Sequence, residues 1–267
     1  MADLKSFDYK ANYKGIIPDG DFRISPSMIS KFNDKKWEWY ASQVIGEDIF
    51  KDNKSTILGT CIHKVAEEWI KNGNFPLGLT EYIDSFNELE LSEKEFIKSQ
   101  LEPMGNALID YLSFFGTPEI SEETIKYEIM PHIWVAGTVD AKIDDCIIDF
   151  KTTSIQTAQE KIPNNYKWQL LTYAWIYKKL GIEVNKIRIV WITQNRVGEI
   201  STKTGKPLKD YYSMAYPITE EITEEDMRFI DDYLHLIAET YQMAKDKPEL
   251  TYLLFADYRL KEKDGNQ

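Results

Sequence analysis

The segment Ile147-Ile148-Asp149-Phe150-Lys151 places a carboxylate and an amine at the end of an apolar run. Side chains alternate between the two faces of a strand, so Asp149 and Lys151 project to one side and Phe150 to the other. The carboxylate can hold a cation. The ammonium group can orient or deprotonate an attacking water and neutralise charge that develops on a phosphate. Taken alone, an Asp-x-Lys triplet is also typical of an ordinary ion pair at a strand edge.

A second carboxylate, Asp140, closes the motif Gly137-x-x-Asp140 on the preceding predicted strand. An antiparallel hairpin that turns at Asp144-Asp145 brings Asp140 beside Asp149. Two carboxylates in close contact repel each other unless a cation lies between them. The hairpin therefore favours a shared metal ion over an exposed strand acid.

Two further pairs of polar residues lie four apart on predicted helices. His63 and Glu67 share a face that flanks a buried stripe, and they can supply a metal ligand and its orienting partner. Glu68 falls on the other flank, so Glu67 is the better candidate. Gln169 and Tyr173 follow the strand motif and can bond a phosphate or hold the lysine of that motif. Taken alone, each pair favours an ordinary amphipathic helix.

The elements that must position these residues follow from hydrophobic periodicity. It predicts helices over residues 25–44, 55–71, 79–115 (as one or two helices), 164–180 and 223–245, with Ser25 as the N-cap of the first. It predicts strands over 122–130, 133–144, 146–152, 186–193 and 211–218, and a polar hairpin or loop over 195–210. Helices precede a compact sheet with a helical crossover, and a final helix follows. This order indicates an α/β fold with a helical N-terminal part.

The chain has 267 residues, of which 43% are hydrophobic, and this is enough for one large core. We expect an irregular lead-in over residues 1–24 and a single domain over 25–260. Its helical part covers about 25–116 and its sheet-containing core about 120–246. Residues 261–267 are predicted to form a frayed tail.

The formal net charge of −12 argues against a passive nucleic-acid binder, which normally carries a basic face. It is compatible with an enzyme that meets phosphates through bound cations. Two lysine clusters interrupt the acidic composition, and each is either a solvated face or a track for phosphates. They are Lys31, Lys35 and Lys36, and Lys203, Lys206 and Lys209.

Only two cysteines are present, Cys61 and Cys146. They are too few for a Cys-ligated iron–sulfur cluster or a Cys-only zinc site, and free thiols in an intracellular protein are the simplest interpretation. The N-terminal residues contain no apolar run typical of a signal peptide, and no stretch reaches the length of a membrane span. We therefore expect a soluble, cytoplasmic protein.

In combination, the motifs resemble the PD-(D/E)XK nuclease superfamily, and within it the RecB-type and phage exonuclease branch. The resemblance rests on four motifs in the right order on the right predicted elements: Gly59-Thr60-x-x-His63-x-x-x-Glu67, Gly137-x-x-Asp140, Asp149-x-Lys151 and Gln169-x-x-x-Tyr173. It covers roughly residues 23–194. It implies a restriction-endonuclease-like mixed central sheet flanked by helices, with the site at one edge.

The resemblance also implies roles for the residues and a divalent cofactor, Mg²⁺ or Mn²⁺. Asp140 and Asp149 are then metal ligands, with His63 as a third ligand and the backbone carbonyl of Phe150 as a fourth. Lys151 is the catalytic lysine. Glu67, Gln169 and Tyr173 are supporting residues. The expected reaction is phosphodiester hydrolysis of DNA that leaves a 5′-phosphate.

Two departures from the family pattern narrow the expectation. The acid before the lysine is more usually Glu, and here it is Asp149, with a shorter reach. Relatives that carry an iron–sulfur cluster have a Cys where Lys35 stands, so no such cluster is expected here. No helicase motor is expected in this chain, so it would be a free-standing nuclease or a subunit that serves a separate helicase or recombinase. A single-strand-binding protein is a further candidate partner. An endonuclease with the same site, or an inactive DNA-binding relative, remains an alternative.

Overall fold

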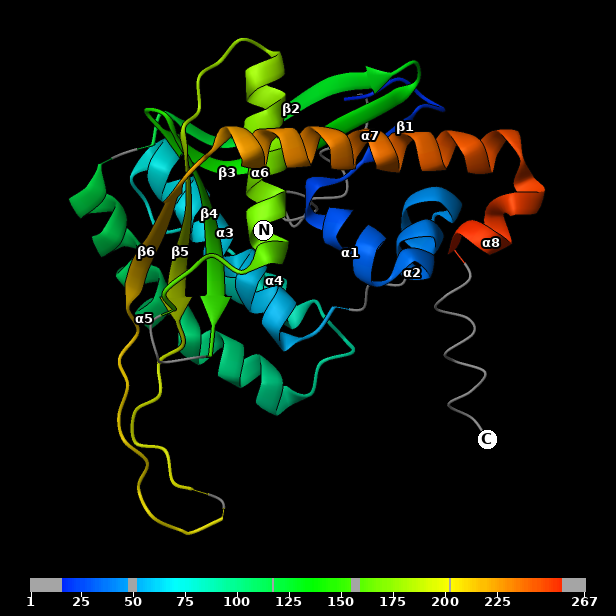
Figure 1. Cartoon of the computed structure of the whole chain (residues 1–267). Coiled ribbons are helices and arrows are strands. Elements are labelled where there is room, and N and C mark those ends of the chain that lie inside the picture. Colours follow the sequence, from blue (N-terminus) through cyan, green and yellow to red (C-terminus); the bar gives the residue numbers. More distant parts are fainter. Residues whose placement is uncertain (1–15, 48–51, 117, 155–158, 202, 256–267) are drawn as a thin grey trace, which may run out of the picture.

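The computed structural model describes residues 16–47, 52–116, 118–154, 159–201 and 203–255, and they form a mixed sheet with helices on both faces (Figure 1). The strands are β1 (Phe22–Ile24), β2 (Ile120–Met130), β3 (Ile133–Ile143), β4 (Cys146–Thr153), β5 (Lys186–Thr193) and β6 (Ala215–Glu221). The main helices are α1 (Ile29–Asp34), α2 (Lys36–Tyr40), α3 (Lys54–Asn72), α4 (Leu79–Asp84), α5 (Leu91–Phe115), α6 (Asn164–Lys179), α7 (Glu224–Asp246) and α8 (Thr251–Phe255). Shorter helical turns are η3 (Pro26–Met28), η4 (Ala41–Ile45) and η5 (Pro248–Leu250).

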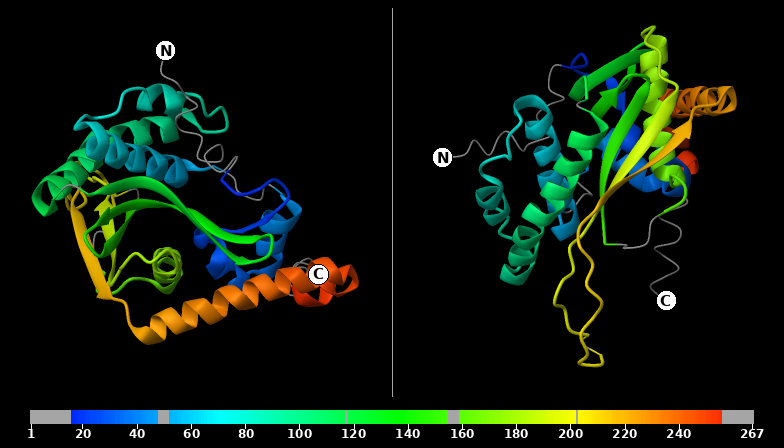
Figure 2. Two further views of the ribbon diagram at one scale, coloured as in Figure 1. Left: turned by 90° about the horizontal axis from the view of Figure 1, so that it is seen from above. Right: turned by 90° about the vertical axis from the view of Figure 1, so that its left-hand side faces the viewer.

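The sheet order is β1-β3-β4-β5-β6, with β2 paired to β3. β4 and β5 run parallel and are joined by the crossover helix α6, whereas β2–β3, β3–β4 and β5–β6 are antiparallel. This architecture confirms the predicted α/β class with a mixed sheet flanked by helices. Seen from above, α3 and α5 cover one face of the curved sheet and α6 and α7 the other (Figure 2).

Two hydrophobic clusters hold these layers together. Ile148 and Phe150 of β4 pack against α3 and α5, whereas Ile147 of the same strand packs against the α6 and α7 side. This alternation is the reason why β4 reads as a continuous apolar run in the sequence. Both cysteines, Cys61 and Cys146, are buried in the cluster on the α3 and α5 side of the sheet. None of the described helices combines the length and apolar character needed to cross a bilayer.

The structure corrects the expectation for residues 22–44. Phe22–Ile24 form β1, which pairs in parallel with Ile133–Val135, so the predicted irregular lead-in does not extend to residue 24. The predicted single helix over 25–44 is broken into η3, α1, α2 and the π-helical turn η4, with an interruption at Lys35, whose φ is −147° and ψ 62°. Ser25 precedes η3 but makes no capping hydrogen bond from its side chain. The predicted frayed tail over 261–267 lies outside the described residues.

Candidate active site

Strand β3 pairs with two different strands, β1 and β4, at its two ends. The candidate site lies between these two pairings. Besides β2, β3 pairs with β1 at its start and with β4 over Ala141–Ile143. Asp140 is the first residue beyond the β4 ladder. Its Oδ2 accepts a hydrogen bond from the backbone N–H of Phe150 at 2.9 Å. A carboxylate thus takes over the role of a backbone acceptor at the point where the two strands part.

The strand registers place three acids in a row. Ala141 pairs with Ser121 of β2 and with Ile148 of β4, so continuing each ladder by one residue sets Glu122 and Asp149 on either side of Asp140. Residues directly opposite one another in antiparallel strands share a face. The β3–β4 register confirms the hairpin predicted from Asp144-Asp145.

Helix α3 adds a histidine to this row. His63 Nδ1 lies 3.3 Å from Asp140 Oδ2, and both side chains are largely buried. One ligand atom from each of His63, Glu122 and Asp140 lies within 4.8 Å of the others. A nitrogen and two carboxylate oxygens at this spacing are a donor set that suits a divalent cation. The helix begins with a capping box at Asn53, which accepts hydrogen bonds from the N–H groups of Ser55 and Thr56.

The sequence analysis missed Glu122 as a site residue. Its backbone φ is +52°, in the left-handed region that non-glycine residues rarely adopt. Such a conformation costs of order 1–3 kcal/mol and is concentrated at functional sites. The β2–β3 turn gave no direct signal. The register shifts by one residue between Glu128 and Met130, so the pairing at the turn, Met130 with Ile133, points to Glu123 and not to Glu122 as the residue opposite Asp140.

Asp149 and Lys151 form a buried ion pair next to the cluster. Lys151 Nζ lies 2.8 Å from Asp149 Oδ1 and 2.7 Å from Oδ2, and Gln169 Nε2 of α6 donates to Oδ1 at 3.1 Å. Among the described groups, none donates a well-aligned hydrogen bond to the buried Oδ2. Its one close polar contact among these groups is the 2.7 Å ion pair with Lys151, so Oδ2 retains lone-pair capacity for a metal ligand. Tyr166, also missed from the sequence, places its ring centroid 5.2 Å from Lys151 Nζ.

Burial and close charges perturb the pKa values of these groups. Burial, reinforced by the charge of Asp140, raises the pKa of Glu122 to about 8. Burial disfavours a charged His63, but the Asp140 carboxylate overcomes it and raises the pKa of His63 to about 9. Burial also raises the pKa of Asp149 to about 6, although Lys151 opposes the shift. Such shifts are typical of acidic groups gathered in one functional site.

The two remaining predicted side chains lie at the edge of this site. Glu67 accepts hydrogen bonds from Lys64 at 2.9 Å and Lys71 at 2.8 Å on its own helix. Its charge still contributes to the raised pKa of Glu122. Tyr173 is buried and packs on Gly137, where a Cβ atom would lie 2.8 Å from Tyr173 Cε1. The structure therefore gives Tyr173 a packing contact beside the site.

A comparison with protein families identifies the chain. The sequence model of the PD-(D/E)XK nuclease superfamily matches residues 23–257, which is most of the protein. This chain belongs to that superfamily. Like other PD-(D/E)XK nucleases, it is a hydrolase of the class that acts on nucleic acids and generally uses divalent metals. The cluster of His63, Glu122 and Asp140, with the buried Asp149 oxygen beside it, has the donor atoms that such an ion requires.

A solved structure of another protein has a similar fold. A structure described as a "putative exonuclease" from Eubacterium rectale aligns with a TM-score of 0.51 at 10% identity, and covers 95% of this chain and 86% of the other. The structure of SSO0001 aligns with a TM-score of 0.35 at 15% identity, covering 87% and 84%, which is too low for an inference. Among curated proteins, none matches this chain.

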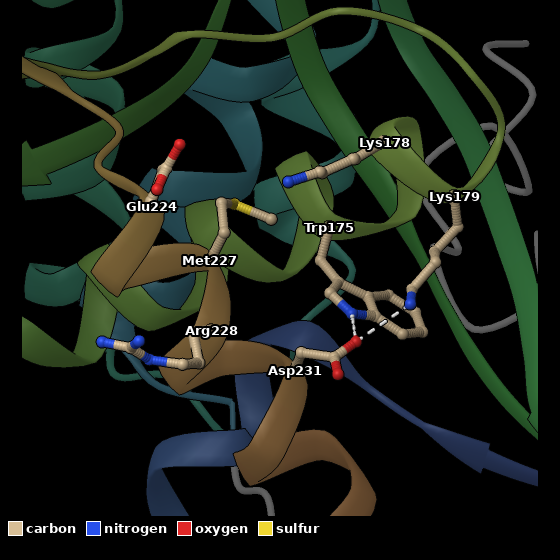
Figure 3. A pocket seen from close by; sticks show the side chains of 7 residues that line it. All are labelled: Trp175, Lys178, Lys179, Glu224, Met227, Arg228 and Asp231. Carbon is tan, nitrogen blue, oxygen red and sulfur yellow. Dashed lines mark hydrogen bonds and ion pairs between the residues drawn. The ribbon is translucent and has the colours of Figure 1, made fainter.

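A cavity of about 450 Å³ lies elsewhere on this nuclease domain, between the end of α6 and the start of α7 (Figure 3). Asp231 accepts a hydrogen bond from Trp175 Nε1 at 2.6 Å and pairs with Lys179 at 3.0 Å across it. None of its seven lining residues belongs to the acidic cluster. This cavity and the acidic cluster therefore occupy different places.

Proposed function

We propose that this protein is a divalent-cation-dependent deoxyribonuclease that hydrolyses phosphodiester bonds, acting as an exonuclease in recombination, repair or phage DNA replication. One observation carries the proposal: the Asp149–Lys151 ion pair lies beside the His63–Glu122–Asp140 cluster. The similarity in fold to the Eubacterium rectale structure supports the exonuclease reading. A soluble cytoplasmic protein that serves a separate recombinase, single-strand-binding protein or helicase is part of the same proposal.

Each residue has a role in this chemistry. His63, Asp140, Asp149 and the carbonyl of Phe150 would hold Mg²⁺ or Mn²⁺, and we add Glu122 to this set. The bound cation supplies a Lewis acid and a more acidic water at neutral pH. Lys151 would orient the attacking water and neutralise charge that develops on the phosphate.

Three residues support these groups. Gln169 fixes the Asp149 carboxylate, so that the acid keeps its orientation when the Asp149–Lys151 pair engages the substrate. Glu67 acts on the site through its charge. Tyr173 acts by holding α6 against β3 at Gly137.

The test is cleavage of linear and closed circular DNA, single- and double-stranded, with Mg²⁺, Mn²⁺ or EDTA. The proposal expects cleavage with a divalent cation, none with EDTA, and digestion of linear but not closed circular DNA. Digestion of circles would favour the endonuclease alternative. If the protein with Mn²⁺ leaves every form of DNA and RNA intact, the proposal fails and an inactive relative is favoured.

Variants connect the activity to the site. Lys151→Ala and Asp149→Ala should each abolish cleavage while the circular dichroism spectrum stays unchanged, since both side chains lie at the cluster. Lys94→Ala is the matched control, because Lys94 is partly exposed on α5 and, among the described residues, its ammonium group bonds only a backbone carbonyl, that of Asp84. Unchanged cleavage by Lys151→Ala would assign the activity to a contaminant or to another site.

A further inference from the structure

The segment between β5 and β6, described over residues 194–201 and 203–214, projects from the molecule as an arm (Figures 1 and 2). It is an ordered hairpin. Arg196 and Tyr211 exchange two backbone hydrogen bonds of 2.7 Å, and Leu208 donates to Glu199 at 2.8 Å. Nearer the tip, Ser201 donates to Lys206 at 2.9 Å. The backbone is therefore held at several levels along the length of the arm.

The root of the arm is fixed to the body next to the candidate site. The buried Gln100 of α5 accepts from the Asn195 N–H at 2.7 Å and donates to its carbonyl at 3.0 Å. Gln194 donates to the carbonyl of Thr153, the last residue of β4, at 2.9 Å. Thr153 follows Lys151 by two residues, a rise of about 7 Å along a strand. The arm thus leaves the sheet at the end where the catalytic lysine lies.

The charge of the arm is opposite to that of the chain. It carries four basic residues and two acidic ones, Glu199 and Asp210, in a protein with 44 acidic and 32 basic residues. None of the four basic side chains forms an ion pair with another described residue. The Asp210 carboxylate accepts a hydrogen bond of 2.8 Å from the backbone N–H of Gly198. The four are Arg196, Lys203, Lys206 and Lys209.

The aromatic side chain of Tyr211 orders two of these cations. The Arg196 guanidinium lies 4.6 Å from the ring centroid and Lys209 Nζ lies 5.3 Å from it. Lys203 and Lys206 are exposed near the turn at Gly205. An extended hairpin arm of this length spans about 25 Å, so its cations can follow the phosphates of about seven base pairs.

We propose that this arm is a substrate clamp that binds the phosphate backbone of duplex DNA away from the scissile bond. The inference rests on the proposed nuclease function for the identity of its ligand. An overall acidic nuclease otherwise repels DNA beyond its metal site, and a local basic arm offsets this repulsion next to the reacting phosphate. Phosphate contacts of this kind position a duplex and carry no sequence information.

The test is fluorescence anisotropy of a labelled linear duplex of about three helical turns, at several KCl concentrations, in EDTA and in Ca²⁺. The triple variant Lys203→Ala, Lys206→Ala, Lys209→Ala should weaken binding about tenfold. It should also make the negative slope of log K against log [KCl] shallower by about 2.7, or 0.9 for each lost contact. The control triple replaces exposed lysines away from the arm, Lys178, Lys245 and Lys247, and should bind as the wild type does.

A second measurement separates this inference from the proposed function. Hydrolysis of bis(p-nitrophenyl) phosphate with Mn²⁺ should be equal in the wild type and the arm triple, because this small diester does not reach the arm. If the wild type cleaves nothing and the arm triple still loses DNA affinity, the nuclease proposal fails, but the proposal that the arm binds DNA is supported. If the triple arm variant has the same DNA affinity and salt slope as the wild type, the proposal that the arm binds DNA is refuted. So does a change confined to the sedimentation coefficient, which would assign the arm to a contact between copies of the chain.

Discussion

Loading the metal-free protein with a divalent cation should release about two protons at pH 7. The ligating forms are a neutral imidazole and an ionised carboxylate, so protons on His63 and Glu122 must leave. With pKa values of about 9 for His63, 8 for Glu122 and 6 for Asp149, these groups hold protons before binding. Their occupancies at pH 7 are about 1.0, 0.9 and 0.1.

The sign and size of the pH dependence follow. Because the free site binds more protons than the loaded site, cation affinity rises with pH. Between pH 7 and pH 8 the free site still holds between about one and two protons more than the loaded site, so affinity should rise by about one to two orders of magnitude over that interval.

Titration calorimetry of Mn²⁺ in two buffers of different ionisation enthalpy measures the released protons directly. Glu122→Gln should lower the count at pH 7 by about one proton. The control Glu68→Gln, on the outer flank of α3, should leave it unchanged. Heats that are independent of the buffer would refute the reasoning, because they would mean that Glu122 is ionised and His63 neutral before the cation binds.

Two other substitutions test how the fold positions the site. Gly137→Ala should lower stability by about 1–3 kcal/mol and the melting temperature by about 2–6 °C, because the new Cβ would lie 2.8 Å from the ring of the buried Tyr173. Gln169→Ala should slow hydrolysis of bis(p-nitrophenyl) phosphate about 10- to 100-fold, since it removes the hydrogen bond that orients Asp149, while DNA affinity in EDTA stays unchanged.

A second glycine provides the control for the first. At Gly105 a Cβ would lie 2.6 Å from Phe75 Cε2, but that ring is partly exposed and can move. Alanine is also favoured over glycine inside α5 by about 1 kcal/mol. Gly105→Ala should therefore match or exceed wild-type thermal stability. Equal melting temperatures for both glycine variants would show that the contact at Gly137 is not rigid.

The sequence predicted the elements whose hydrophobic pattern is long and regular. β5 was predicted over 186–193 and is observed as Lys186–Thr193, and the helix bearing His63 extends one residue beyond each predicted end. β1 was missed because three residues are too few for an alternating pattern. The break at Lys35 was missed because the apolar spacing continues across it with no glycine or proline.

The residues of the candidate site could be predicted where both their chemical type and their position in a hairpin or helix were visible in the sequence. Asp140 and Asp149 follow from a short hairpin, and His63 from a helix face. Glu122 was not found because its left-handed backbone has no sequence signature at a non-glycine residue. Whether a polar side chain on α6 meets the site or packs beside it depends on how the helix is rotated against the sheet. The sequence therefore did not distinguish Gln169 from Tyr173.

The left-handed backbone at Glu122 also ties chemistry to the completeness of folding. Before β2 has paired with β3, residue 122 can keep the extended conformation that its neighbours favour. Its carboxylate is then not directed toward Asp140. A nascent or partly opened chain would then lack one acid of the cluster. The donor set for a cation would then be complete only once β2 and β3 have paired.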